Sequence, residues 1–367
     1  MKYIASIIVI FLALSSVIFA SQDINIKSRG IIFTGSQTIA NLGSDTVAIG
    51  KWDNTIQIIK SKTINSDSTI PNLMQTLVLP SKNGVQMLSS LNNNAFISNG
   101  SATSLDIWLK DSSGNYKFYK KASYENLANA PGVANSGAEI KYGGKLYFIS
   151  GHQNGCILIW IVSGNTLTLS KEINIHSHNP IKSPYPLKNI RGIAVWKNGL
   201  FVTGSEDGDL VLLNVKGETL YRTRYNPNAE RGVNNIEIDG NYLIVSNCEV
   251  GNYDRNLWLY KLGSNQISYL DSLNLKDDQS LTQVFDFGVS IGRLNDEFVF
   301  FASTGEGILW YGSIQNDRLV LSGHKLLTPN LGAVTYFNSS NDTLYESSYD
   351  TGVFSVASNN GKVKFRN

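Results

Sequence analysis

Residues that build metal centres and redox sites are scarce in this chain of 367 residues, which has two cysteines, four histidines and three methionines. Charge of one sign is missing too, because 31 Lys+Arg nearly balance 29 Asp+Glu. No basic cluster stands out, which argues against a nucleic-acid or polyanion partner. These absences exclude some classes of partner and do not identify one.

The familiar catalytic signatures are also missing. The chain contains no phosphate-binding loop, no dinucleotide fingerprint and no G-x-S-x-G elbow that would nominate a serine. His176-Ser177-His178 is the only histidine pair, and no acidic or cysteine ligand lies near it in sequence, so we expect neither a metal nor a cofactor. A Ser-His-Asp triad stays open, since its members need not be close in sequence, but no catalytic residue is predicted.

Long hydrophobic runs are absent except at the N-terminus. Met1-Lys2 gives a short basic start, Ile4–Ala20 is almost wholly apolar, and Ala20 offers a small residue for cleavage. This layout predicts a secretory signal peptide over residues 1–20, a secreted or periplasmic protein, and no membrane insertion after cleavage. An uncleaved anchor is the alternative, because the run is close to the shortest that spans a bilayer.

A repeated strand unit fills residues 21–367, which we expect to form a single domain. Leu200–Val215 shows it best, with two short strands around the turn Ser205–Gly208. Seven copies follow one another without helical periodicity, and a fourth strand follows the third in most copies. The pattern predicts an all-β chain that folds as a seven-bladed β-propeller of four-stranded antiparallel blades. The first apolar residues of the third strands are Ile56, Leu105, Ile157, Leu210, Leu257, Ile308 and Val353.

The turn before the third strand resembles that of WD-repeat propellers. Gly204–Leu210 and Gly151–Trp160 are similar to the family's G-S-x-D-G-x-h-x-h-W run, and the other copies match more loosely. The chain is therefore identified as a divergent WD-repeat-like propeller. In that family a Gly-His pair before the first strand donates to the turn aspartate. No copy has that pair in place, so Asp207 is expected to lack a histidine partner, and the resemblance implies the fold without a function.

Two expectations concern the ends of the chain and the cysteines. Ile24–Phe33 reads as a strand that pairs beside the C-terminal blade and hides its edge. Lys362–Phe365 follows a hairpin turn and would complete that blade locally. Cys156 and Cys248 fall two blades apart, too far for a disulfide, so two unpaired and largely buried thiols are expected.

Long connections precede blades three to six on one face, and long loops on rigid scaffolds tend to carry function. Loops without functional constraint are the plain alternative. Arg191-Gly192 and Arg231-Gly232 put an arginine at the same place before a first strand. Each arginine could bind an anion at the channel mouth, or it could pack on a neighbouring blade's loop through a surface ion pair. The candidate binding residues are Tyr124, His176, His178, Tyr185, Arg191, Tyr225, Glu230, Arg231 and Asp286.

These features favour an exported, monomeric interaction scaffold without chemistry of its own. Its expected partner is a protein, peptide or glycan that binds the face carrying the long loops. The alternative is a propeller-type hydrolase or lyase with its site at the mouth of the central channel.

Overall fold

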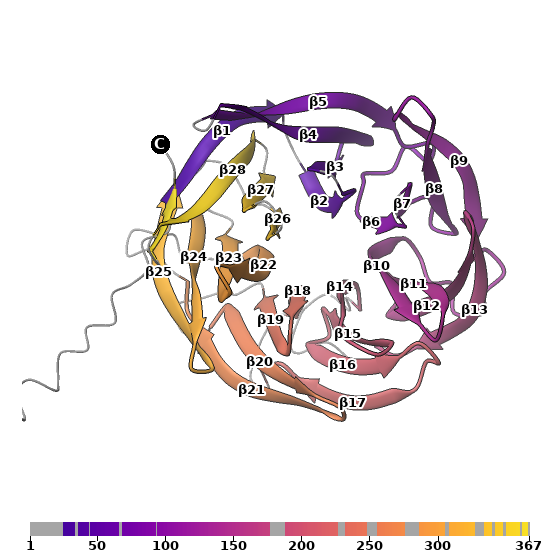
Figure 1. Cartoon of the computed structure of the whole chain (residues 1–367). Coiled ribbons are helices and arrows are strands. Elements are labelled where there is room, and N and C mark those ends of the chain that lie inside the picture. The colour runs from indigo at the N-terminus through magenta and orange to yellow at the C-terminus, as the bar shows by residue number, and fades with distance from the viewer. Residues whose placement is uncertain are drawn as a thin grey trace, which may run out of the picture.

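A computed structural model gives the architecture of most of the chain. It describes residues 25–33, 36–43, 45–65, 68–92, 94–176, 188–226, 232–247, 255–275, 286–304, 308–326, 334–339, 342–347, 350–359 and 362–365. The predicted signal peptide lies outside these residues. The regular elements of the described residues are all strands, and they form sheets arranged as a ring about a central axis (Figure 1). Among the described residues, no helix has the length and apolar character needed to cross a membrane.

Six sheets are four-stranded antiparallel blades built from consecutive strands, which we number 1 to 6 in chain order. Blades 1 to 3 consist of β2 (Ser36–Asn41), β3 (Thr46–Lys51), β4 (Thr55–Asn65), β5 (Ser68–Val78); β6 (Leu88–Leu91), β7 (Ala95–Asn99), β8 (Ser104–Lys110), β9 (Tyr116–Ser123); and β10 (Ala134–Tyr142), β11 (Lys145–His152), β12 (Cys156–Ser163), β13 (Thr166–Asn174). Blades 4 to 6 consist of β14 (Ile190–Val195), β15 (Leu200–Ser205), β16 (Asp209–Asn214), β17 (Thr219–Arg224); β18 (Val233–Asp239), β19 (Tyr242–Asn247), β20 (Leu257–Gly263), β21 (Gln266–Leu273); and β22 (Asp286–Leu294), β23 (Glu297–Thr304), β24 (Ile308–Gln315), β25 (Arg318–Leu326).

The expectation of seven four-stranded blades is wrong, because six sheets of the described residues have that form. The remaining sheet, which we call the closing sheet, is five-stranded and joins both ends of the chain. Its strands are β26 (Val334–Asn338), β27 (Thr343–Ser347), β28 (Asp350–Asn359), β29 (Lys362–Phe365) and the N-terminal β1 (Asn25–Phe33). In Figure 1 the indigo β1 lies beside the yellow β28.

In the closing sheet β1 covers the edge of β28 that faces away from β27, and β29 lies on the opposite side of β28 from β1, because Val356 and Ala357 pair with both strands. The strand β29 pairs only with Val356–Asn359, whereas β1 runs antiparallel along β28 from Asn25↔Ala357 to Phe33↔Asp350. An uncovered strand edge would leave backbone donors and acceptors without partners. The predicted pairing of the N-terminal strand beside the C-terminal blade is confirmed.

The outermost strand of every four-stranded blade carries one extra residue opposite the third strand. Such a β-bulge bends the strand and increases its twist, and it also spoils the edge as a template for aggregation. The repeat of this bulge in all six blades is a regularity that strand patterning alone did not predict. The extra residues are Met74, Tyr119, Ser170, Leu220, Leu270 and Ser322.

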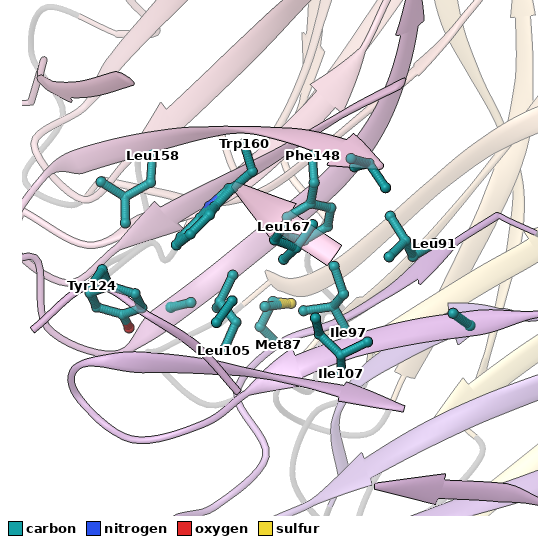
Figure 2. Packing of buried hydrophobic residues seen from close by; sticks show 14 residues of the cluster. Met87, Leu91, Ile97, Leu105, Ile107, Tyr124, Phe148, Leu158, Trp160 and Leu167 are labelled. Atoms are coloured by element: carbon teal, nitrogen blue, oxygen red, sulfur yellow. The ribbon is translucent and has the colours of Figure 1, made fainter. Parts of the chain in front are cut away.

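The core lies between neighbouring blades rather than within one. Figure 2 shows the cluster between blades 2 and 3, where Phe148 and Trp160 of blade 3 pack against Leu105 and Ile107 of blade 2. Each of these four side chains is at most 2% exposed. Because one blade has two apolar faces, a ring of blades is the arrangement that buries both of them.

Candidate functional site

The predicted binding residues divide into those that the structure describes and those that it does not. His178, Tyr185, Glu230 and Arg231 lie outside the described residues. Asp286 opens β22, where its backbone is in register with Thr304, and its side chain lies outside the described part. The described candidates are Tyr124, His176, Arg191 and Tyr225.

Tyr124 and Tyr225 belong to a set that we call the plug residues, each of which directly follows or nearly follows the outermost strand of its blade. The plug residues are large and at most 4% exposed, and they extend into the interface with the next blade. The backbone N–H of Tyr124 donates to the Thr103 carbonyl at 2.8 Å, and that of Tyr225 donates to the Gly208 carbonyl at 3.0 Å. Both bonds tie the end of the blade to its own turn between second and third strands. The set comprises Leu79, Tyr124, Ile175, Tyr225 and Leu275.

Both tyrosines therefore support packing between blades. The Tyr124 hydroxyl donates to the Gly132 carbonyl at 3.0 Å, and its ring meets the edge of His152 at 4.9 Å. Tyr225 packs edge-on against Trp258 of blade 5 at 5.5 Å, and its carbonyl accepts the Tyr260 hydroxyl at 2.7 Å. Each tyrosine is 3% exposed, so neither presents a solvent-facing surface.

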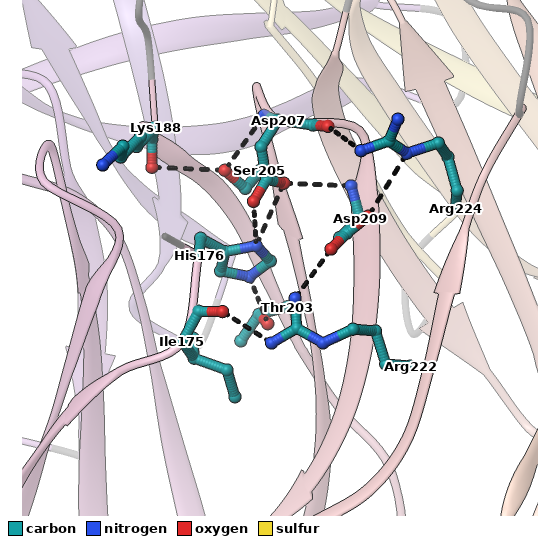
Figure 3. Close-up of polar contacts among 9 residues, drawn as sticks. All are labelled: Ile175, His176, Lys188, Thr203, Ser205, Asp207, Asp209, Arg222 and Arg224. Carbon is teal, nitrogen blue, oxygen red and sulfur yellow. Dashed lines mark hydrogen bonds and ion pairs between the residues drawn. The ribbon is translucent and has the colours of Figure 1, made fainter. Parts of the chain in front are cut away.

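His176 is the centre of a buried polar network between blades 3 and 4 (Figure 3). Its Nδ1 lies 3.1 Å from both carboxylate oxygens of Asp207, and its Nε2 lies 3.0 Å from the Thr203 hydroxyl. All three side chains are fully buried. Burial favours the neutral form of Asp207, yet the hydrogen bonds from His176, the Asp209 N–H and Ser205 prevail and lower the pKa of that carboxyl.

The expectation that Asp207 lacks a histidine partner is wrong. His176 supplies the ring that the family resemblance would place directly before the first strand of the blade. It was missed because His176 precedes β14 by more than ten residues, so the family's sequence spacing is absent. The useful signal would have been the histidine directly after the plug residue Ile175.

The order Asp207, His176, Thr203 matches that of a catalytic triad, but burial assigns it a structural role. A nucleophile must reach its substrate, and the Thr203 side chain has no solvent exposure. The network instead joins the end of blade 3 to the turn of blade 4. Thr203 corresponds in strand register to Ser98 and Ser150, which accept hydrogen bonds from Trp108 and Trp160 at 2.9 and 3.0 Å.

Two arginines of β17 surround the network on its outer side. Arg222 pairs with Asp209 at 2.6 Å and also donates to the Ile175 carbonyl at 2.6 Å. Arg224 lies 3.4 Å from Asp209 and donates to the Asp207 carbonyl at 3.3 Å. The outermost strand therefore holds both the turn and the chain segment that carries His176.

Arg191 is the extra residue of a bulge in the innermost strand of blade 4, between Ile190 and Gly192. Its Nε donates to Glu206 at 2.7 Å, and Asn189 donates to the other oxygen of Glu206 at 2.8 Å. The arginine thus forms an ion pair, but the expectation of a partner on a neighbouring blade's loop is wrong, because Glu206 belongs to the turn of the same blade.

The proposed correspondence between Arg191-Gly192 and Arg231-Gly232 is wrong. Val233 in blade 5 is the counterpart of Ile190 in blade 4. Each is the first residue of the innermost strand, each pairs with the last residue of the second strand, and each directly precedes a bulge. Arg231 therefore comes before the first strand, whereas Arg191 lies inside it.

Cys156 is buried and free, as expected, and burial raises the pKa of its thiol to about 11, with a smaller contribution from Glu172. Cys248 lies outside the described residues. Within the described part of the chain, no group of three or more His, Cys, Asp or Glu side chains is placed to hold a metal ion.

Trp52 is the candidate that the sequence analysis overlooked. It occupies the same turn position in blade 1 as Glu206 in blade 4, and its side chain is 56% exposed. Its ring lies on Gly84, where a Cβ would come within 3.1 Å of the ring atom Cε3. Asn99 fixes this loop by donating to the Gly84 carbonyl at 3.1 Å and by accepting the Gln86 N–H at 2.8 Å. Trp52 is therefore an exposed aromatic side chain on a rigid support.

Comparison with known proteins shows the fold. No family model matches the chain, and no curated protein matches it. Among solved structures, the chain is similar to the β-propeller domain of Cps50 (Swd1) from Myceliophteria thermophila, with 13% sequence identity and a TM-score of 0.64. The similarity covers 89% of this chain and 99% of that domain. At this identity the likeness shows a β-propeller fold and says nothing of a family or a ligand.

Proposed function

We propose that this chain is an interaction scaffold that binds a protein, peptide or glycan on the face formed by the connections between blades and the turns before the third strands. Export after removal of residues 1–20, and a monomeric state, are parts of the same proposal. The sequence of the first twenty residues supports export, and the ring architecture supports a scaffold role.

The exposure of Trp52 on this face carries the proposal. Tryptophan is among the residues that contribute most to the binding energy of protein interfaces. Because Trp52 rests on a rigid loop, its side chain would lose little conformational entropy when a partner binds. The other described polar groups of this face mainly hold the ring together, as the His176 network and the Arg191–Glu206 pair illustrate. The alternative of a hydrolase or lyase gains no support from Arg191, whose guanidinium already has a carboxylate partner.

A binding comparison of three proteins tests the proposal. The full chain, Trp52→Ala, and the matched control Tyr269→Ala, which removes an equally exposed ring from the outer strand of blade 5, are immobilised and exposed to extracellular proteins and glycans of the source. We expect Trp52→Ala to weaken capture at least about tenfold, a change typical of an interface anchor. Equal capture by all three proteins would refute the assignment of this face.

A further inference from the structure

We propose a second docking surface, away from that face, on the outer rim of blades 1 and 2. It takes an extended polypeptide segment that carries both apolar and acidic side chains. The surface, which we call the blade 1–2 rim, consists of five side chains on the outermost strands β5 and β9: Leu73, Met74, Val78, Phe118 and Tyr119.

Exposed apolar side chains are concentrated on this rim. Among the described residues, nine large hydrophobic side chains are exposed, and five of them belong to β5 and β9. Their exposed fractions run from 41% for Phe118 to 66% for Val78. These five side chains lie on the outermost strands of two adjacent blades, and apolar side chains exposed together are typical of interaction surfaces. Single exposed residues elsewhere need no such explanation.

The two strands form one rigid unit. The Gln75 side chain donates to the Tyr116 carbonyl at 2.8 Å and accepts the Tyr116 N–H at 2.8 Å, so it bridges the outermost strands of neighbouring blades. Phe118 rests edge-on against the buried Trp108, with ring centroids 5.8 Å apart. A partner therefore meets apolar groups that are already in place, which reduces the entropy that binding would cost.

The charge of the rim determines the chemistry of the partner. The strand β5 contains no charged residue, and β9 contains Lys117, Lys120 and Lys121 without an acidic residue. Lys117 pairs with Asp111 at 2.9 Å, whereas Lys120 donates to the neutral Thr166 hydroxyl at 2.7 Å. The rim is therefore apolar and positive. A second copy of the same rim would be repelled, and an acidic segment is complementary.

The depth of the apolar groups favours a polypeptide over a lipid surface. Amphipathic elements bind membranes by burying an apolar face several ångströms deep at the headgroup boundary. A third or more of each rim residue is covered by the rest of the protein, so each side chain offers a shallow contact. Shallow apolar contacts beside lysines suit the alternating side chains of an extended segment.

Selection from a random-peptide library on the immobilised full chain tests the inference. We expect enriched peptides that combine apolar and acidic residues. Their affinity, measured by fluorescence anisotropy, should fall about tenfold or more for Met74→Ser/Tyr119→Ser and for Lys120→Glu/Lys121→Glu. The matched control Leu321→Ser, on the outer strand of blade 6, and Trp52→Ala should keep the affinity within about twofold.

Several outcomes would overturn the inference. These are no enrichment, peptides without acidic residues, or equal binding to the rim variants and the wild type. Binding to phosphatidylcholine vesicles that contain phosphatidylserine, abolished by the lysine substitutions, would assign the rim to a membrane instead. Thermal unfolding of each variant shows that the fold is retained. Because Trp52→Ala leaves the rim intact, failure of this inference is distinguishable from failure of the proposed function.

Discussion

At the scale of single residues, the buried polar groups of this propeller differ in whether they have partners. His176 has one at each ring nitrogen, and its removal would leave the buried Asp207 carboxylate with only the Asp209 N–H and Ser205 as partners. Removing one partner of a buried ionic contact is far more costly than losing a surface pair. The network of blade 4 should therefore contribute more to stability than its number of hydrogen bonds suggests.

His176→Ala should lower the free energy of unfolding by about 3 kcal/mol or more, measured by urea denaturation. The matched control is Arg191→Ala, which breaks the half-exposed ion pair with Glu206 and should cost less than about 1 kcal/mol. Equal losses for the two variants would contradict the structural role of His176. A double-mutant cycle with Asp207→Asn then isolates the coupling between ring and carboxylate.

Asp106 differs from His176 because, within the described part of the chain, its buried polar atoms have no hydrogen-bond partners. Among the described residues it is fully buried, and neither of its carboxylate oxygens has a hydrogen-bond partner. Burial raises its pKa to about 6, against the opposing effect of Lys121. In strand register it corresponds to Leu158 and Val211, which are apolar. The charge at this position is therefore a liability for the folded state.

Asp106→Leu should stabilise the protein by about 1–3 kcal/mol at pH 7, because it removes an unsatisfied buried group. The folded state binds this proton more tightly than the unfolded state, whose pKa is near 3.8. The stabilisation that comes from the tighter binding of this proton in the folded state is thus fully present below pH 3.8, and it is lost as the pH rises through 6 and Asp106 ionises. Melting temperatures at pH 4 and pH 7 check this. The advantage of the variant should shrink at pH 4, and an unchanged advantage would contradict it.

At the scale of elements, the turns between second and third strands do two jobs. They close each hairpin, and their carbonyls accept the N–H groups of the plug segments that lead to the next blade. In blade 3 the Gly155 carbonyl accepts from both Ile175 and His176, at 3.2 and 3.1 Å. Gly155 has φ +78°, and a Cβ there would overlap the His176 carbonyl. Only glycine satisfies the turn and the neighbour together.

Gly155→Ala should therefore cost more than the strain of its backbone alone. Its matched control is Gly164→Ala, at a turn with φ +56° where a Cβ meets nothing within 4 Å. The control should lose about 1–2 kcal/mol from backbone strain, whereas Gly155→Ala should lose clearly more because the segment carrying His176 must move. Chemical denaturation of the two variants provides the measurement. Equal losses would show that the close approach of Gly155 to His176 does not affect the free energy of unfolding.

At the scale of the whole molecule, closure depends on strands from the two ends of the chain. The strand β1 pairs with β28 along Asn25–Phe33, so the ring can close only when β28, near the C-terminus, is present. This non-local contact connects the N-terminal strand β1 with β28, the strand before the last, in one sheet.

A chain that begins at Ser36 should lose about 3 kcal/mol or more of stability relative to one that begins at Asn25, because it lacks the ladder hydrogen bonds of β1. Adding a peptide with the sequence of residues 25–33 should raise its melting temperature in a concentration-dependent way. Equal melting of the two chains would show that closure does not need β1.

Sequence patterning by itself determined the all-β class, the repeat and the N-terminal strand that joins the last sheet. These features depend on local alternation and on turn residues such as those at Ser205–Gly208, which act over a few positions. Only the tertiary structure decided that six sheets are four-stranded while the closing sheet has five strands, that Tyr124 and Tyr225 pack between blades, and that Asp207 has His176 as its partner. Each of these outcomes depends on contacts between segments brought together by the ring, and the loop after His176 hides the family's spacing. Burial and long-range pairing are properties of the whole ring, so no short stretch of sequence encodes them.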